Sequence, residues 1–228
     1  MCHPDDEIFI GATIQKFDRD GAEVSLAWTH DLPIRRTEAI AAAQLFPVPE
    51  ERLHFFGGRD GSVIDDYDTV FPKLNSLIEE LAPDRVLTVA YEQGHIDHDA
   101  TNLFVNLAYQ GPVYEWPMYF TYLTRTPIMN RFAEPAEEEV RQLTREEREL
   151  KTKLAKAFPS QTIWRNIVWY QRWRRLVLDR VDLLGEERLR LQTHHDWTKP
   201  NLPEPLKQRV QQSPTWARWT AAVDQLLR

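Results

Sequence analysis

Apolar residues in the first half of the chain follow two alternating spacings. Stretches in which they recur every three or four positions predict helices, and short continuous apolar runs predict buried strands. The expected helices cover residues 7–20, 34–45, 69–81 and 98–109, and the expected strands cover residues 23–28, 52–56 and 85–90. This alternation predicts an α/β fold, with a three-layer, Rossmann-like, mostly parallel sheet flanked by helices.

The second half of the chain has a different pattern. Thr144 and Glu147 have the spacing of a capping box, which predicts a helix through about residue 157. Tryptophans then recur at helical spacing, and Pro214 separates two short helices expected in the tail. We therefore expect an α/β core over residues 1–125 and a helical, Trp-rich C-terminal part over residues 126–228, packed on the same domain.

The start of the chain lacks one element that this fold normally has. The first expected helix opens at a loop that a parallel strand would deliver, yet only Met1 and Cys2 precede His3. The first strand is apparently missing from the sequence as given. We expect either a truncated start or another segment in that position, and we favour truncation.

Composition narrows the range of functions. The net charge of −7 argues against nucleic acid as the main partner. No apolar run approaches the roughly 18 residues that a membrane span needs. The single cysteine, Cys2, excludes an intrachain disulfide and suits a reducing cytosol. Because the first residues also lack a signal-peptide pattern, we expect a cytoplasmic protein; a homo-oligomer is compatible with the sequence.

Two short clusters of histidines and carboxylates carry the candidate chemistry. Residues 3–7 read His-Pro-Asp-Asp-Glu, and residues 95–98 read His-Ile-Asp-His. His3 and Asp6 are three positions apart on a helical turn and can converge on one cation, which leaves Asp5 to face a water molecule. Each cluster alone is more often a capped turn or a surface loop. Together they have the composition of a divalent metal centre with a carboxylate to spare.

These clusters and three further motifs resemble the PIG-L/LmbE family of zinc-dependent N-deacetylases. The further motifs are Arg-Arg-Thr-Glu at 35–38, Phe-Phe-Gly-Gly-Arg-Asp-Gly at 55–61, and Ser-Gln at 160–161. The resemblance covers residues 3–110 and extends weakly to about residue 161. It implies that His3, Asp6 and His98 bind the metal, with Zn²⁺ expected and Fe²⁺ as the alternative.

The resemblance also implies roles for residues around the metal. Asp5 would be the general base that activates water, and His95 would stabilise the oxyanion or protonate the leaving amine. Asp97 would orient His95. Arg35 and Asp60 match positions that hold the sugar in family members.

Two further candidate substrate-binding residues are Gln93, which departs from the family pattern, and His30, where family members often have a polar residue. Several members have a tyrosine two residues before the first histidine of the second cluster, where this chain has Gln93. An amide can donate a hydrogen bond to an oxyanion but cannot transfer a proton as a phenol does. Tyr91 is a possible substitute for that tyrosine. His30 follows the expected strand 23–28 and is a candidate for lining the pocket.

The function implied is hydrolytic removal of an acetyl group from an N-acetylated sugar, in an N-acetylglucosaminide-type glycoconjugate or metabolite. One alternative is a non-haem Fe(II) oxygenase, because two histidines and one carboxylate also form its facial triad. The additional carboxylate of Asp5 and the α/β pattern disfavour that enzyme. Another alternative is a non-catalytic remnant of the family that binds metal or sugar.

Overall fold

The computed structural model describes residues 1–123, 128–135, 137–176 and 182–227. Its strands form a parallel pair, β1 with β2, and a four-stranded sheet in the order β3-β4-β6-β5. The strands are β1 (Leu26–His30), β2 (Leu53–Gly58), β3 (Val86–Val89), β4 (Val113–Trp116), β5 (Glu139–Gln142) and β6 (Glu186–Leu191). β3 and β4 are parallel, whereas β6 runs antiparallel to both of its neighbours.

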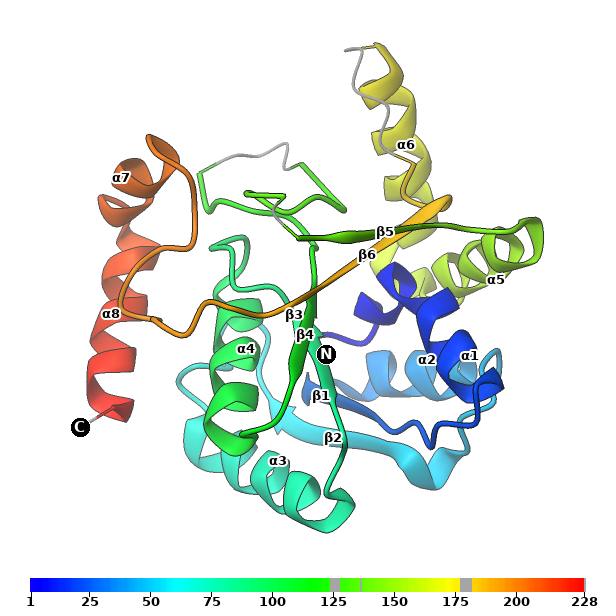
Figure 1. Ribbon diagram of the computed structural model, residues 1–228, viewed down its shortest axis with the longest axis horizontal. Helices are drawn as coiled ribbons and strands as arrows, with labels where there is room; N and C mark the ends of the chain where they lie inside the picture. The colour runs from blue at the N-terminus through cyan, green and yellow to red at the C-terminus, as the bar shows by residue number, and fades with distance from the viewer. Residues whose placement is uncertain (124–127, 136, 177–181, 228) are drawn as a thin grey trace.

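Helices cover both faces of these strands (Figure 1). The α-helices are α1 (Gly11–Arg19), α2 (Pro33–Ala43), α3 (Tyr67–Leu81), α4 (Ile96–Ala108), α5 (Arg145–Lys156), α6 (Ile163–Leu176), α7 (Leu206–Gln211) and α8 (Pro214–Leu226). Short 3₁₀ helices are η1 (Asp6–Phe9), η2 (Glu50–Arg52) and η3 (Pro159–Gln161). One buried cluster packs α1, α2, α5 and α6, and a second packs α3, α4 and α8. The predicted α/β class with flanking helices is confirmed.

The structure agrees with the local signals in the sequence. In α3, Val70, Leu74 and Leu77 are buried on one face, as helical spacing predicts. The capping box of α5 is complete, because Thr144 Oγ1 accepts from Glu147 N at 3.3 Å and Glu147 Oε2 accepts from Thr144 N at 2.9 Å. These contacts satisfy donors that a helix start otherwise leaves unpaired.

Met1 and Cys2 lie alongside β1. Thr29 N donates to Met1 O at 3.1 Å, and His30 N donates to Cys2 O at 2.9 Å. The Met1 amino group donates to Ala27 O at 2.8 Å, which completes a parallel pairing. These bonds place the residue that follows, His3, at the carboxyl end of β1. The missing first strand remains a prediction.

The C-terminal part contains strands β5 and β6 in addition to the expected helices. Its residues Leu154, Phe158 and Ile167 share a buried cluster with Trp28 of β1. The two predicted parts therefore pack together, while the division at residue 125 remains a prediction.

The side chain of Glu187, on β6, contacts the start of α1. Its carboxylate accepts from Ala12 N at 2.9 Å and from Thr13 N at 2.8 Å, and also from Thr13 Oγ1 at 2.7 Å. A carboxylate is favourable there because the first amides of a helix have no partner within the helix and carry partial positive charge. The buried amino group of Lys151 lies 3.6 Å from the same carboxylate. Glu187 therefore holds the helix that follows the first histidine cluster.

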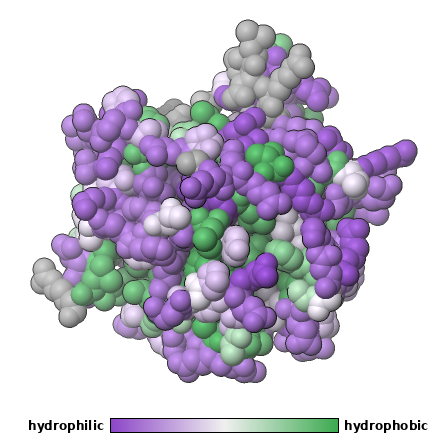
Figure 2. Space-filling model, in the orientation of Figure 1, coloured by the Kyte–Doolittle hydropathy of each residue, from purple (hydrophilic) through white to green (hydrophobic). Residues whose placement is uncertain are grey.

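Hydrophilic residues cover most of the face shown in Figure 2, with hydrophobic residues visible toward its middle. Among the helices in the described parts of the chain, none has both the length and the apolar character needed to cross a membrane.

Candidate metal centre

The loop that carries the first cluster is held by the carboxylate of Asp6. Its Oδ2 accepts from the backbone N of Cys2 and of His3, both at 2.9 Å. Burial opposes ionisation of Asp6, but His98, His3 and these hydrogen bonds lower its pKa below the ordinary value. Asp6 is therefore a carboxylate whose second oxygen, Oδ1, is free to face the site.

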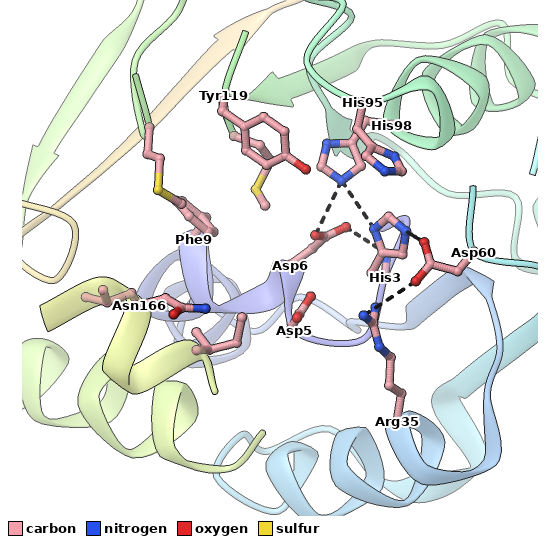
Figure 3. Close-up of a pocket in the computed structure, with 14 residues that line it drawn as sticks. His3, Asp5, Asp6, Phe9, Arg35, Asp60, His95, His98, Tyr119 and Asn166 are labelled. Atoms are coloured by element: carbon pink, nitrogen blue, oxygen red, sulfur yellow. Dashed lines mark hydrogen bonds and ion pairs between the residues drawn. The ribbon is translucent and has the colours of Figure 1, made fainter. Parts of the chain in front are cut away.

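Asp5 has a strained backbone, with φ at 129°. A non-glycine residue in this region costs about 1–3 kcal/mol and is typical of functional sites. The side chain of Asp5 lines the pocket, as Figure 3 shows. Burial, followed by the adjacent charge of Asp6, raises the pKa of Asp5 well above its ordinary value. A carboxylate with a raised pKa is better suited to accept a proton from water.

The second cluster opens α4. Asp97 N donates to His95 Nδ1 at 3.3 Å, so His95 caps the helix, and His98 lies buried one turn later. With Nδ1 acting as acceptor, a neutral His95 carries its proton on Nε2. Burial lowers the pKa of His95, which favours this neutral form.

The fold brings the two clusters together (Figure 3). His3 Nδ1 lies 3.3 Å from His98 Nε2, and His98 Nε2 lies 3.7 Å from Asp6 Oδ1. Potential ligand atoms of Cys2, His3 and His98 all lie within 4.8 Å of one another, as do those of His3, His95 and Asp97. The structure thus offers the two predicted histidines together, with Asp6 on the His98 side and the Cys2 thiol as an additional donor.

The chemistry of these donors fits a divalent metal. Burial lowers the pKa of His98 to about 3, so its imidazole is neutral and keeps a lone pair for a cation. Burial also lowers the pKa of His3, but the Cys2 thiol and nearby carboxylates outweigh burial and hold that pKa well above its usual value. The surroundings of His3 therefore favour positive charge. Two imidazoles with a carboxylate suit zinc or ferrous iron.

Asp97 lies closer to His3 than to the residue it was expected to orient. Its Oδ2 is 3.5 Å from His3 Nε2 and 3.9 Å from His95 Nδ1. The same carboxylate accepts from Gly61 N at 2.5 Å and Val63 N at 3.0 Å, which fixes its position. Its side chain thus contacts both histidines and lies nearer to His3, a common arrangement behind metal-binding histidines, and its expected role in orienting His95 remains a prediction.

Arg35 and Asp60, the two residues whose predicted role is to hold the sugar, lie together at one end of the pocket. Arg35 Nη2 lies 3.6 Å from Asp60 Oδ2, and Asp60 Oδ1 lies 3.5 Å from His3 Nε2. Arg35 also donates to Gln161 Oε1. The motifs at 35–38 and 160–161 therefore contact each other across the fold.

Gln93 and His30 do not line the pocket. Gln93 has φ at 51°, and its Oε1 accepts from Asn201 N at 2.8 Å, so the amide faces a C-terminal loop. His30 is buried with its ring 5.1 Å from that of His3, and its nitrogens have no hydrogen-bond partner among the described residues. Tyr91 is also remote, since its hydroxyl donates to backbone carbonyls of residues 197 and 199. The substrate-binding roles of Gln93 and His30 remain predictions, with neither residue among those that line this pocket.

Tyr119 places a phenol beside the two clusters. Its ring lies 5.3 Å from that of His98, and it lines a cavity of about 340 Å³ beside both clusters. Burial raises the pKa of Tyr119 above its usual range, so the hydroxyl stays protonated and can donate. The sequence analysis missed this residue, although it follows β4 at the carboxyl edge where α/β proteins bind ligands.

The other lining residues that sequence reasoning missed come from η1, the segment after β4, and α6. They are Phe9, Met118, Met129, Ile163, Asn166 and Ile167. No pattern in the sequence indicated their role, and only the folded chain shows that they line the same pocket as the two histidine clusters.

Comparisons with known proteins give a family match and a shared fold. The model of the family described as PIG-L, GlcNAc-PI de-N-acetylase, matches residues 1–109. No curated protein matches the chain.

Three solved structures illustrate the shared fold. A deacetylase triple mutant from the teicoplanin biosynthetic pathway has a TM-score of 0.58 at 20% identity, covering 83% of this chain and 94% of its own. The A40926 pseudoaglycone deacetylase Dbv21 has a TM-score of 0.55 at 18% identity, covering 85% and 96%. The conserved protein TT1542 from Thermus thermophilus has a TM-score of 0.57 at 15% identity, covering 86% and 94%. The family match over residues 1–109 confirms the resemblance inferred from the motifs, and the solved structures show that the fold is shared.

Proposed function

We propose that this protein is a metal-dependent N-deacetylase that releases acetate from an N-acetylated sugar. The observation that carries the proposal is the meeting of His3 and His98 at 3.3 Å, beside the strained Asp5 and a cavity of about 340 Å³. The family match supports the same reaction class.

His3, Asp6 and His98 would hold the metal, with the Cys2 thiol as a neighbouring donor. Zinc or ferrous iron bound there would polarise the amide carbonyl and lower the pKa of water. A solved teicoplanin deacetylase is described as a zinc-inhibited form, which shows that zinc interacts with a protein of this fold. The nitrogen and oxygen donors of this chain suit either metal.

Asp5 accepts the proton of the attacking water in this proposal. Its raised pKa and its position on the pocket wall support the role. His95, with its proton on Nε2, and Tyr119, with its phenol protonated, face the pocket and donate hydrogen bonds to the oxyanion that forms from the carbonyl. The proton held by Asp5 then passes to the departing amine, and the products are the free amino sugar and acetate.

Arg35 and Asp60 bind the hydroxylated part of the substrate. A guanidinium donates hydrogen bonds and a carboxylate accepts them, so the pair can bind substrate hydroxyl groups both as acceptors and as donors. An N-acetylglucosaminide is the substrate we favour, since the matching family acts on an N-acetylglucosamine conjugate by its description. The buried, free thiol of Cys2 is compatible with the cytosolic location predicted from the sequence.

The experiment is an acetate-release assay with N-acetylglucosamine and its simple glycosides, on protein loaded with zinc or, anaerobically, with ferrous iron. We expect acetate and free amine in equal amounts, loss of activity with a chelator, and recovery on adding metal. Oxygen uptake without amide hydrolysis would favour the oxygenase. Bound metal without either reaction would favour the non-catalytic alternative.

A further inference from the structure

The pocket has two ends of unlike chemistry, one on each side of the candidate metal ligands. Arg35 and Asp60 lie on one side of His3 and Asp6, whereas Phe9 lies on the other (Figure 3). The second end is lined mainly by apolar side chains, namely Phe9, Met118, Met129, Ile163 and Ile167. The polar groups that hydrolyse the amide therefore stand between a hydrogen-bonding end and an apolar end.

The apolar end is held by specific contacts. Asn130 N donates to Met118 O at 2.9 Å, and Met129 N donates to the hydroxyl of Tyr170 at 2.9 Å. The second bond ties the segment after β4 to α6, which supplies Ile163 and Ile167. Apart from Phe9, the apolar end is thus lined by parts of the chain that lie beyond the family match over residues 1–109.

We propose that the apolar end receives the acyl group of the substrate, and that the preferred substrates carry an acyl chain longer than acetyl. This inference rests on the proposed function. When an amide carbonyl lies at His3 and His98 and its hydroxylated amine half lies at Arg35 and Asp60, the acyl group extends to the opposite side. An acetyl methyl covers little of the apolar surface there, whereas a longer chain removes more of it from water.

Two of the wall residues, Met118 and Met129, suit acyl chains of different lengths. Methionine is unbranched and flexible, so it adapts its shape to an irregular or variable partner. We therefore expect a graded preference that rises with chain length up to the size of the cavity. The competing occupant of the apolar end is an apolar group attached to the sugar, which would make the acyl length unimportant.

The test compares N-acetyl, N-butanoyl and N-hexanoyl glucosamine, with free amine measured for each. Burial of the added methylenes predicts a kcat/KM about tenfold or more higher for hexanoyl than for acetyl. Equal or falling kcat/KM along the series would overturn the inference while leaving the proposed function in place. Amine release from no member would overturn both. Enhanced hydrolysis with an apolar glycoside, but not with a longer acyl chain, would assign the apolar end to the glycoside instead.

A pair of bulky substitutions on one helix localises the effect. Ile163→Trp places a large ring in the apolar end, whereas Arg165→Trp places it on the exposed side of α6, outside the pocket. We expect Ile163→Trp to lower the hexanoyl-to-acetyl ratio of kcat/KM about tenfold and Arg165→Trp to leave that ratio unchanged. The same ratio in both variants would contradict the placement of the acyl chain, and circular dichroism would establish that both proteins are folded.

Discussion

Glu38 of α2 accepts two hydrogen bonds from Ser160, a residue far away in the sequence. Ser160 N donates to Oε1 at 2.8 Å, and Ser160 Oγ donates to Oε2 at 2.6 Å. Bonds to a carboxylate contribute about 1.5–3 kcal/mol each. We expect Glu38→Ala to lower the free energy of unfolding in urea by about 2–4 kcal/mol.

A substitution of Ser160 distinguishes the loss of this contact from other effects of Glu38→Ala on stability. Ser160→Ala removes one of the two bonds and should cost less than Glu38→Ala. In the double variant the two losses should not add, because both remove the same interaction. Strict additivity would show that the contact does not stabilise the fold.

Asp5→Asn should abolish most turnover while leaving the bound metal. Asparagine keeps the size of the side chain and tolerates a positive φ, but its amide cannot accept a proton from water. We expect kcat to fall by about 10²–10⁴. Metal analysis and acetate release on the same preparation check this; a variant with the activity of the parent would show that the base lies elsewhere.

Removing one imidazole should remove the metal. We expect His98→Ala to bind zinc more than about a hundredfold more weakly. Loss of a residue that only hydrogen-bonds a metal ligand already weakens metal binding by about 10–100-fold, and loss of a ligand itself should weaken it more. Isothermal titration of metal-stripped protein measures the affinity. His54→Ala is a matched control, since His54 lies on β2 and does not line the pocket. Equal affinity in the two variants would contradict the proposed ligands.

Tyr119→Phe should lower kcat with little change in KM. Phenylalanine keeps the ring beside His98 but removes the hydroxyl that faces the pocket. Loss of one oxyanion donor costs about 10²–10³ in kcat. Tyr109→Phe serves as the control, because that hydroxyl donates to Pro83 O away from the site. A shared, small decrease in both variants would indicate that Tyr119 only packs.

The free energy of unfolding should decrease as pH rises between the pKa of Glu92 in the unfolded chain and its higher pKa in the folded chain. Its Oε1 accepts from Ala133 N at 2.6 Å, and burial raises its pKa from 4.5 to about 8. Between these values the unfolded chain has lost the proton that the folded chain still holds, so stability falls with pH until about pH 8.

Glu92→Gln removes this titration while keeping the acceptor for Ala133. We expect the variant to show a smaller decrease in the free energy of unfolding between about pH 5 and pH 9, by a few kcal/mol. Urea unfolding at several pH values measures it. Parallel pH dependences for the two proteins would mean that Glu92 is not the group responsible.

The regular helices and the parallel strands could be predicted because their signals are local. The buried face of α3 and the capping box at Thr144 depend on residues a few positions apart. β6 could not be recognised in this way, since its sequence is Glu-Glu-Arg-Leu-Arg-Leu. Its charged side chains are buried together with partners that are distant in the sequence. Arg188, for example, lies 2.6 Å from the carboxylate of Glu138.

The histidine and carboxylate residues of the site were predictable because their motifs are short and distinctive. The orientation of Gln93 was not, because it depends on one backbone angle and on Asn201 in a distant loop. Tyr119 and the wall from α6 were missed for a similar reason. Their position in the pocket follows from long-range packing, which leaves no pattern in a single sequence.

The contact of Glu187 with the first turn of α1 has a consequence for the order in which the protein becomes functional. During synthesis the loop with His3 and Asp6 leaves the ribosome before residue 187, so the helix behind this loop lacks its carboxylate cap until residue 187 has followed. A nascent chain that ends earlier would expose the free amides of that helix, and the loop with the candidate metal ligands would be held less firmly.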